Sequence, residues 1–215
     1  MTTKALLCGR GRSLIHYKNI LDNKYQYACL VNEFNLFIRE DKHLLNFLKS
    51  LSKETFLTQQ VNISTSGVDD FLLDNISIDE ITCTRLKPNG ESFWWRDYVN
   101  TAALGCYGRD LTLQPEKISA HMHRIENSLG VAVLNLILEK NCTEIDIIGS
   151  DFYEDDYYLS HREYDWEQTS RKETQDRLKS GFDYIISEFK DVQFNLYTCS
   201  TYKNSSSNCF IERVV

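Results

Sequence analysis

Short apolar runs that alternate with helical patterns constrain the fold of this chain more than any other feature. Four runs rich in β-forming residues, bounded by glycine, asparagine or charged residues, predict strands at 5–8, 25–31, 145–148 and 193–197. Helical periodicity occupies residues 13–21, 126–140 and 167–190. Alternating strands and helices are typical of a doubly wound α/β sheet. We therefore predict a Rossmann-like, mostly parallel sheet with helices on both faces.

The predicted helix at 126–140 is apolar nearly all the way round, which predicts that it is buried against the sheet. Residues 56–61 and 78–84 also look like strands, but their sequence does not order them in the sheet. Residues 204–208 predict a polar loop or the start of a frayed tail. We expect one domain over residues 1–215, with a short lid at 153–166.

Composition narrows the classes of protein to consider. The chain has 215 residues, of which 42% are hydrophobic and 26% charged, a balance typical of a folded domain. Its formal net charge of −7 argues against a dedicated nucleic-acid binder. Seven cysteines without a C-x-x-C motif favour free thiols over disulfides or a zinc site. The apolar run near the N-terminus is too short for a secretory signal, so we expect a cytoplasmic protein.

A predicted strand, a glycine turn and a helix start form the first candidate site. Gly9 and Gly11 follow the strand, and Ser13 begins the helix. Glycines let the backbone approach a phosphate, and a helix N-terminus offers unpaired N–H groups. Arg10 and Arg12 add positive charge, so this segment is a candidate nucleotide-phosphate site. The alternative is an ordinary turn in which Ser13 caps the helix.

Two further segments lie where an α/β sheet would contact a nucleotide. Asn32 follows the second predicted strand, at the position of a ribose or base contact. A turn-forming asparagine is the alternative there. Ser128 and Gly130, on either side of Leu129, open the apolar helix and form a second candidate anion site or a simple cap.

The strand at 145–148 ends in a polar and aromatic segment. Gly149, Asp151 and Tyr153 follow it directly, and ligands of open α/β sheets bind at the carboxyl ends of strands. Tyr157 and Tyr158 come next, in a polar loop. Tyrosine hydroxyls can donate hydrogen bonds to a leaving phosphate without a metal, so this segment is a candidate catalytic site. An aromatic plug over the sheet is the alternative.

Three of the histidines raise chemical hypotheses. His161 precedes the last long helix and is a candidate general base, because an imidazole can accept the proton of a sugar hydroxyl near neutral pH. A plain surface histidine is the alternative. His121 and His123 would share a face if they lay on a strand, but no cysteine or carboxylate pattern accompanies them, so we expect no metal site.

The order of these motifs resembles that of the bacterial lipooligosaccharide sialyltransferases, glycosyltransferase family 42. The resemblance covers residues 4–35 and 124–199 and is most specific over 128–153, where a Ser-x-Gly helix start, a strand and Gly-x-Asp-Phe-Tyr recur at the family's spacing. A weaker similarity is to the sialylmotifs of animal sialyltransferases. The family has one Rossmann-like domain with a small lid. It transfers sialic acid from CMP-sialic acid to a sugar hydroxyl, with inversion and without a metal.

The resemblance implies a role for each matched residue. His161 would be the general base, and Tyr153 would support the leaving phosphate together with a second tyrosine, Tyr158 or Tyr157. The donor-contacting residues would be Gly9, Arg10, Gly11, Ser13, Asn32, Ser128, Leu129, Gly130, Gly149, Asp151 and Tyr157. The chain departs from the family pattern at Arg10, where the family has asparagine, and at Leu129, where it has a small polar residue. The segment between Tyr153 and His161 is also much shorter than in the family.

The partners implied are a nucleotide-sugar donor and a glycan acceptor, with no cofactor or metal. Association with the inner face of a membrane and a homo-oligomer are left open. Two other hypotheses also stay open: a pyrophosphokinase-like relative that uses another nucleotide donor, and a non-catalytic nucleotide-binding module. A nicotinamide dehydrogenase is disfavoured, because Asn32 replaces the acidic ribose residue and the third glycine of that fingerprint is absent.

Overall fold

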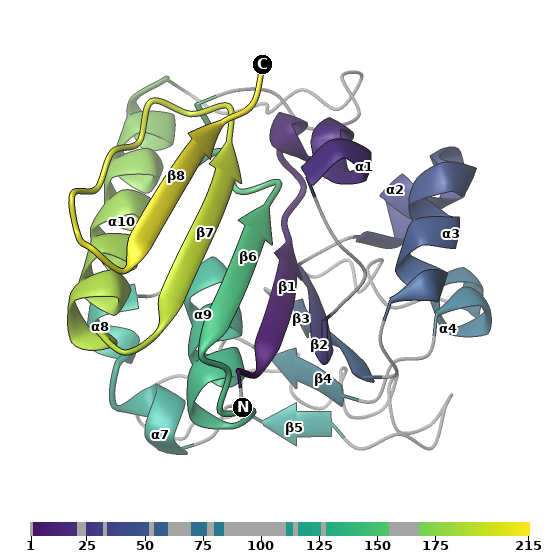
Figure 1. Ribbon diagram of the computed structural model, residues 1–215, viewed down its shortest axis with the longest axis horizontal. Helices are drawn as coiled ribbons and strands as arrows, with labels where there is room; N and C mark the ends of the chain where they lie inside the picture. The colour runs from purple at the N-terminus through teal and green to yellow at the C-terminus, as the bar shows by residue number, and fades with distance from the viewer. Residues whose placement is uncertain are drawn as a thin grey trace.

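A parallel sheet runs through the computed structural model, which describes residues 2–20, 25–31, 34–51, 54–59, 70–76, 80–83, 111–113, 116–125, 128–154 and 168–215. Within these residues eight strands pair in the order β5-β4-β3-β2-β1-β6-β7-β8, and every neighbouring pair is parallel (Figure 1). The strands are β1 (Lys4–Cys8), β2 (Tyr27–Val31), β3 (Glu54–Gln59), β4 (Glu80–Cys83), β5 (Leu111–Leu113), β6 (Glu144–Ile148), β7 (Gln193–Thr198) and β8 (Cys209–Arg213).

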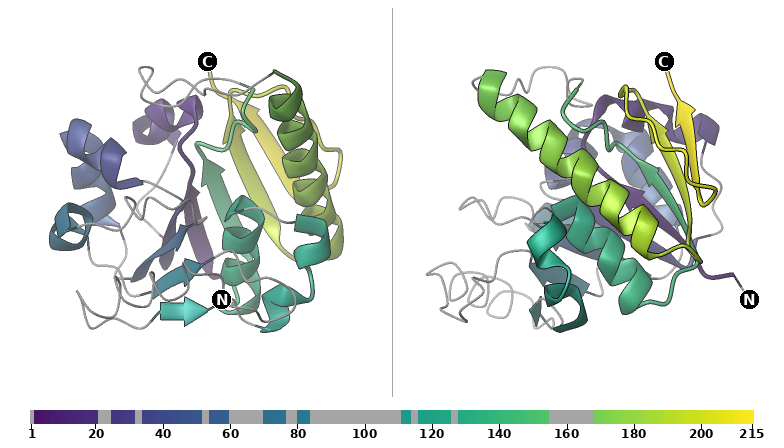
Figure 2. Two further views of the ribbon diagram at one scale, coloured as in Figure 1. Left: turned by 180° about the vertical axis from the view of Figure 1, so that it is seen from behind. Right: turned by 90° about the vertical axis from the view of Figure 1, so that its left-hand side faces the viewer.

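Helices cover both faces of this sheet, as Figures 1 and 2 show. Alternate side chains of β1 enter different cores: Ala5 and Leu7 pack with the helices that follow β5, whereas Leu6 and Cys8 pack with the helices that follow β1 and β2. The helices are η1 (Arg12–His16), α1 (Tyr17–Ile20), α2 (Phe34–Glu40), α3 (Lys42–Ser50), α4 (Asp70–Asn75), α7 (Glu116–Ser119), α8 (Met122–Ile125), α9 (Ser128–Leu138) and α10 (Gln168–Glu188). The predicted Rossmann-like, doubly wound fold is confirmed.

Helix α9 is buried on all sides, as its composition predicts. Residues 131–134 are fully inaccessible to solvent, and they pack with β1, β6 and α10 in one core. Burying a Val or Leu side chain contributes about 1.5–3 kcal/mol each, so α9 is a major source of stability for this half of the sheet. None of the described helices is both long enough and apolar enough to cross a membrane.

The structure orders the middle strands and extends the sheet at its C-terminal end. The predicted runs at 56–61 and 78–84 correspond to β3 and β4, which continue the sheet beyond β2. The polar segment 204–208 is a loop that leads into β8 rather than a frayed tail. Asn208 anchors this loop, because its Nδ2 lies 3.1–3.2 Å from the carbonyl oxygens of Ile186, in the last turn of α10, and of Phe189 and Val192, which follow that helix.

Five of the cysteines that the structure describes are free thiols, as predicted. Cys8, Cys29 and Cys142 are buried, and Cys199 and Cys209 are partly exposed. Burial raises the pKa of the Cys142 thiol to about 12, which keeps it protonated and unreactive at neutral pH.

Candidate functional site

The sheet changes winding direction between β1 and β6. These strands are adjacent and parallel, yet β2 to β5 lie on one side of them and β7 and β8 on the other. In open α/β sheets this switch point is where ligands bind, outside the carboxyl ends of the strands. The segments that leave it are 9–13 after β1 and 149–154 after β6, which are two of the four segments that the sequence analysis selects.

Glycines bring the two strand ends into backbone contact. A Cβ on Gly9 would lie 2.2 Å from the carbonyl oxygen of Gly149, and a Cβ on Gly149 would lie 2.2 Å from the carbonyl oxygen of Gly9. Gly149 also has a φ of 73°, which favours glycine. The N–H groups of Gly9 and Gly11 donate to the carbonyls of Ile148 and Gly149, at 2.7 Å each. The close approach of the two strand ends therefore requires glycine at these positions, whether or not a ligand binds there.

Ser13 is hydrogen bonded to both Asp151 and Gly149, which joins the two strand ends. Oδ2 of Asp151 accepts from the backbone N–H of Ser13 at 2.8 Å, and Oγ of Ser13 accepts from the N–H of Gly149 at 2.9 Å. Both side chains are buried. Ser13 is not the predicted helix cap, because η1 begins at Arg12 and Gly11 takes the cap position. Asp151, which follows the neighbouring strand β6, instead supplies a hydrogen-bond acceptor to the first turn of η1.

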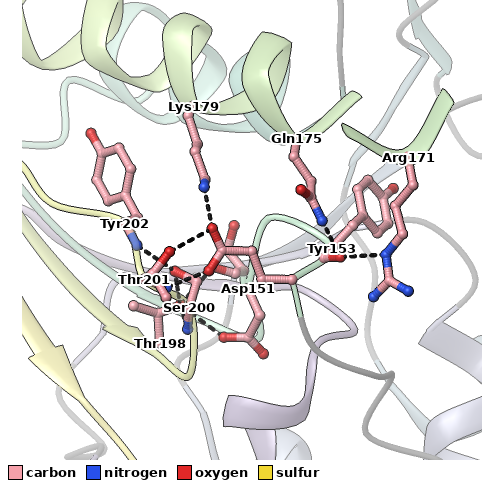
Figure 3. Close-up of polar contacts among 11 residues, drawn as sticks. Asp151, Tyr153, Arg171, Gln175, Lys179, Thr198, Ser200, Thr201 and Tyr202 are labelled. Carbon is pink, nitrogen blue, oxygen red and sulfur yellow. Dashed lines mark hydrogen bonds and ion pairs between the residues drawn. The ribbon is translucent and has the colours of Figure 1, made fainter. Parts of the chain in front are cut away.

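The second oxygen of Asp151 joins β6 to β7. Oδ1 accepts from Oγ1 of Thr198 at 2.9 Å and from the N–H of Cys199 at 2.8 Å (Figure 3). Asp151 thus connects the carboxyl ends of β1, β6 and β7 with one carboxylate. Thr198 and Cys199 are not among the predicted site residues, because only the pairing of β6 with β7 brings them beside Asp151.

Phe152 and Tyr153 lie in the turn that follows β6, and both have positive φ angles, 50° and 57° respectively. Phe152 is buried, with its ring centroid 4.7 Å from that of Tyr202. Tyr153 is partly exposed, and its carbonyl oxygen accepts hydrogen bonds from Arg171 and Gln175 of α10. Phe152 is thus buried in the core, whereas Tyr153 packs against the edge of that core and remains partly exposed, next to the turn after β1 and the candidate site.

The other predicted residues that the structure describes lie in the turn after β1 and in the first turn of α9. Arg10 is partly buried between the two glycines and Arg12 is exposed at the start of η1. Leu129 is partly buried and Gly130 is buried in the first turn of α9, which begins at Ser128. A short connection joins the end of α9 to the start of β6, so α9 runs antiparallel to that strand. The first turn of α9 therefore lies toward the carboxyl edge of the sheet.

The remaining predictions lie outside the described residues. These are Asn32, Tyr157, Tyr158 and His161, together with the predicted lid from 155 onward. Their assignments stay predictions.

No group of three or more histidine, cysteine or carboxylate side chains suited to a metal ion occurs among the residues that the structure describes. His121 lies in a turn, where Nδ1 is 2.8 Å from the hydroxyl of Tyr184, and His123 is in α8, where Nδ1 is 3.1 Å from the carbonyl oxygen of Ala120. The two histidines do not share a strand face, so the reason for considering them a metal pair is removed.

Glu154, at the end of the turn after β6, forms an ion pair. Its carboxylate contacts Lys179 of α10, and it accepts hydrogen bonds from the N–H of Thr201 and, at 2.9 Å, from the hydroxyl of Thr201. Burial alone would raise the pKa of Glu154, but these donors outweigh it and lower that pKa below its usual value. The turn after β6 is therefore bonded to α10 and to the loop after β7.

No family model matches the sequence, and no curated protein matches it. Solved structures do match. The sialyltransferase CST-II, in complex with a trisaccharide acceptor and CMP, is 15% identical with a TM-score of 0.57, over 90% of this chain and 80% of that chain. CstII from Campylobacter jejuni with cytidine-5'-monophosphate is 14% identical with a TM-score of 0.58, over 97% and 84%. The same enzyme with CMP-3FNeuAc is 13% identical with a TM-score of 0.57, over 98% and 86%.

These matches span nearly the whole of this chain and most of each solved structure. At 13–15% identity these matches show that the fold is shared, and they do not show that the chemistry is shared. The chain thus has the Rossmann-like α/β fold of the sialyltransferase CstII, as the order of its motifs predicts.

Proposed function

We propose that this chain is a glycosyltransferase that transfers sialic acid from CMP-sialic acid to a sugar hydroxyl of a glycan acceptor. The observation that carries the proposal is the likeness, over 90–98% of the chain, to sialyltransferase structures that hold CMP or a CMP-sugar analogue. A fold of this kind supports many activities, so the residues of the site must also suit this reaction.

The arrangement of the candidate residues supports a nucleotide donor at the switch point. Gly9, Gly11, Gly149 and Asp151 belong to one hydrogen-bonded unit at the carboxyl edge, and the first turn of α9 lies toward the same edge. Arg10 lies within this unit, in a chain of net charge −7. Local positive charge of this kind is what a nucleotide phosphate would need in an acidic protein.

The proposed reaction is a single displacement. The oxygen of the acceptor hydroxyl attacks the anomeric carbon of the sialyl group while the bond from that carbon to the phosphate oxygen breaks. CMP leaves with the electron pair, and the proton of the hydroxyl passes to His161, the proposed general base. Tyr153 and Tyr158 donate hydrogen bonds to the phosphate as its charge grows. A single phosphate leaves, so this scheme needs no metal ion.

The first experiment is a thermal-shift and calorimetric comparison of CMP, CDP, UDP, ATP and NAD. We expect CMP and CDP to raise the Tm, because binding to the folded state alone stabilises it. A shift with ATP that depends on Mg²⁺ would favour the pyrophosphokinase-like relative. No shift with either cytidine nucleotide would contradict the proposal.

The second experiment separates an enzyme from a binding module. Wild-type protein is expected to release CMP from CMP-sialic acid, whereas His161→Ala is expected to bind CMP normally and lose turnover. His43→Ala is the matched control, because His43 is exposed on α3. CMP binding by the wild type without release of CMP from CMP-sialic acid, alone or with glycan acceptors, would favour a non-catalytic module.

A further inference from the structure

The turn after β6 has an uncommon backbone for its sequence. The N–H of Glu154 donates to the carbonyl of Asp151 at 2.9 Å, and both central residues, Phe152 and Tyr153, have positive φ. This is the pattern of a type I′ turn, in which asparagine and glycine are the usual central residues. A bulky residue in this region costs roughly 1–2 kcal/mol. Such a conformation persists only where the surrounding structure holds it.

Helix α10 holds the middle of this turn. Nε of Arg171 donates to the carbonyl oxygen of Tyr153 at 2.8 Å, and Nε2 of Gln175 donates to the same oxygen at 2.7 Å (Figure 3). Arg171 and Gln175 are four residues apart, so they lie on one face of the helix. Two donors engage both lone pairs of one carbonyl oxygen, which fixes the plane of the peptide that follows Tyr153.

The residues on either side of Tyr153 are anchored separately. Phe152 packs against the rings of Tyr202 and Phe182, with centroid distances of 4.7 and 5.9 Å. Glu154 pairs with Lys179, one further turn along α10. Because both neighbours are held elsewhere, the bonds from Arg171 and Gln175 act chiefly on the backbone of Tyr153. They therefore set the backbone from which its ring packs against the edge of the core, and so the direction of its hydroxyl.

We propose that Arg171 and Gln175 are positioning residues that aim the Tyr153 hydroxyl at the leaving phosphate by holding its carbonyl oxygen. This inference rests on the proposed function, in which Tyr153 supports the departure of CMP. Neither residue touches the substrate in this scheme. Their loss leaves Tyr153 present but misdirected, and a misplacement of about 1 Å can cost as much as a hundredfold in rate.

The test compares Arg171→Met and Gln175→Leu with wild type in CMP release from CMP-sialic acid. Each variant is expected to lower kcat by roughly tenfold or more while KM changes less than about threefold, because the lost contact matters in the transition state. Lys172→Met is the matched control, since Lys172 is exposed on α10. If Arg171→Met does not fold, Arg171→Lys replaces it, because it keeps the charge and lacks the Nε donor.

A double-mutant cycle with Tyr153→Phe tests whether the two residues act through Tyr153. In the Tyr153→Phe background, Gln175→Leu is expected to lower kcat by less than about twofold, because the hydroxyl that it positions is already gone. Full additivity would overturn the inference. So would wild-type kcat in folded Arg171→Met and Gln175→Leu proteins.

Amide hydrogen exchange provides a readout without substrate. The Glu154 amide, bonded to Asp151, is expected to exchange at least about tenfold faster in both variants than in wild type or Lys172→Met. Unchanged exchange would overturn the inference even if activity fell. A wild-type protein that neither binds CMP nor releases it from CMP-sialic acid would instead overturn the proposed function, and the positioning role with it.

Discussion

The backbone N–H of Ser13 donates a 2.8 Å hydrogen bond to Oδ2 of Asp151, a residue 138 positions away in the chain. This bond joins the turn after β1 to the end of β6, at the point where the sheet changes winding direction. A candidate nucleotide site is thus built on a buried carboxylate whose oxygens are engaged by the protein itself. Asp151 is therefore better placed to support the shape of the site than to contact a ligand.

Replacing Asp151 with asparagine is expected to destabilise the protein by about 1.5–3 kcal/mol, the range for a hydrogen bond to a charged group. The amide has one acceptor oxygen, so its NH₂ group would face a backbone N–H or the Thr198 hydroxyl. Urea denaturation measures the loss. Asp176→Asn, an exposed change on α10, is the control and should stay within about 0.5 kcal/mol. Equal stability of the two variants would contradict the bonding described.

Gly9→Ala is expected to destabilise the fold in the absence of any nucleotide. The added Cβ would lie 2.2 Å from the Gly149 carbonyl oxygen, so the strand ends would have to separate, at a cost of about 3 kcal/mol or more. Gly149→Ala should cost at least as much, because its φ of 73° adds strain. Thermal unfolding without ligand checks both. A Gly9→Ala protein of wild-type Tm that has lost only CMP binding would show that the glycine serves the ligand instead.

Asn208→Ala is expected to lower the free energy of unfolding by about 1–2 kcal/mol. Nδ2 of Asn208 satisfies carbonyl groups at the end of α10, and those of Ile186 and Phe189 would lose this partner. Chemical denaturation gives the size of the effect. Ser205→Ala, an exposed change in the same loop, is the control. A similar loss in both variants would mean that the loop as a whole, rather than this amide, carries the stability.

The lowered pKa of Glu154 predicts a dependence of stability on pH. A carboxyl group with a lower pKa in the folded state than in the unfolded state stabilises the fold above its unfolded pKa, ordinarily 4.5, and this stability is lost as the pH falls through the folded pKa. Glu154→Gln should therefore be less stable than wild type at pH 7, and the difference should shrink below pH 4.5. Urea denaturation across this range provides the measurement. A difference that stays constant down to pH 2 would rule out the ion pair with Lys179 as its source.

Periodicity in the sequence was enough to predict the fold class. The runs at 5–8 and 145–148 are rich in apolar residues, as buried parallel strands require, with Asp146 as the polar exception, and both became strands of the central sheet. The apolar composition of α9 likewise predicted its burial. Strand order in the middle was not predictable, because the pairing of β3 with β2 and of β4 with β3 depends on contacts between distant segments.

The candidate site was predictable in part. Gly9, Gly11, Gly149 and Asp151 were recognised because each follows a strand end, and all four meet at the switch point. Thr198, Arg171 and Gln175 carried no local signal: a threonine at a strand end and polar residues on a helix are common everywhere. The hydrogen bonds that Asp151 and Tyr153 make with them arise only when β7 and α10 pack beside β6.

The sequence alone determined which segments are strands, which helix is buried and where glycine and acidic residues follow a strand, because these properties depend on neighbours within a few positions. Only the tertiary structure decided what those residues do. The Gly9–Gly149 contact, the three-strand bonding of Asp151 and the anchoring of Tyr153 by α10 join segments between 18 and 140 positions apart. Hydrogen bonds and close packing depend on distance in space, and distance in space is set by how the helices and strands pack.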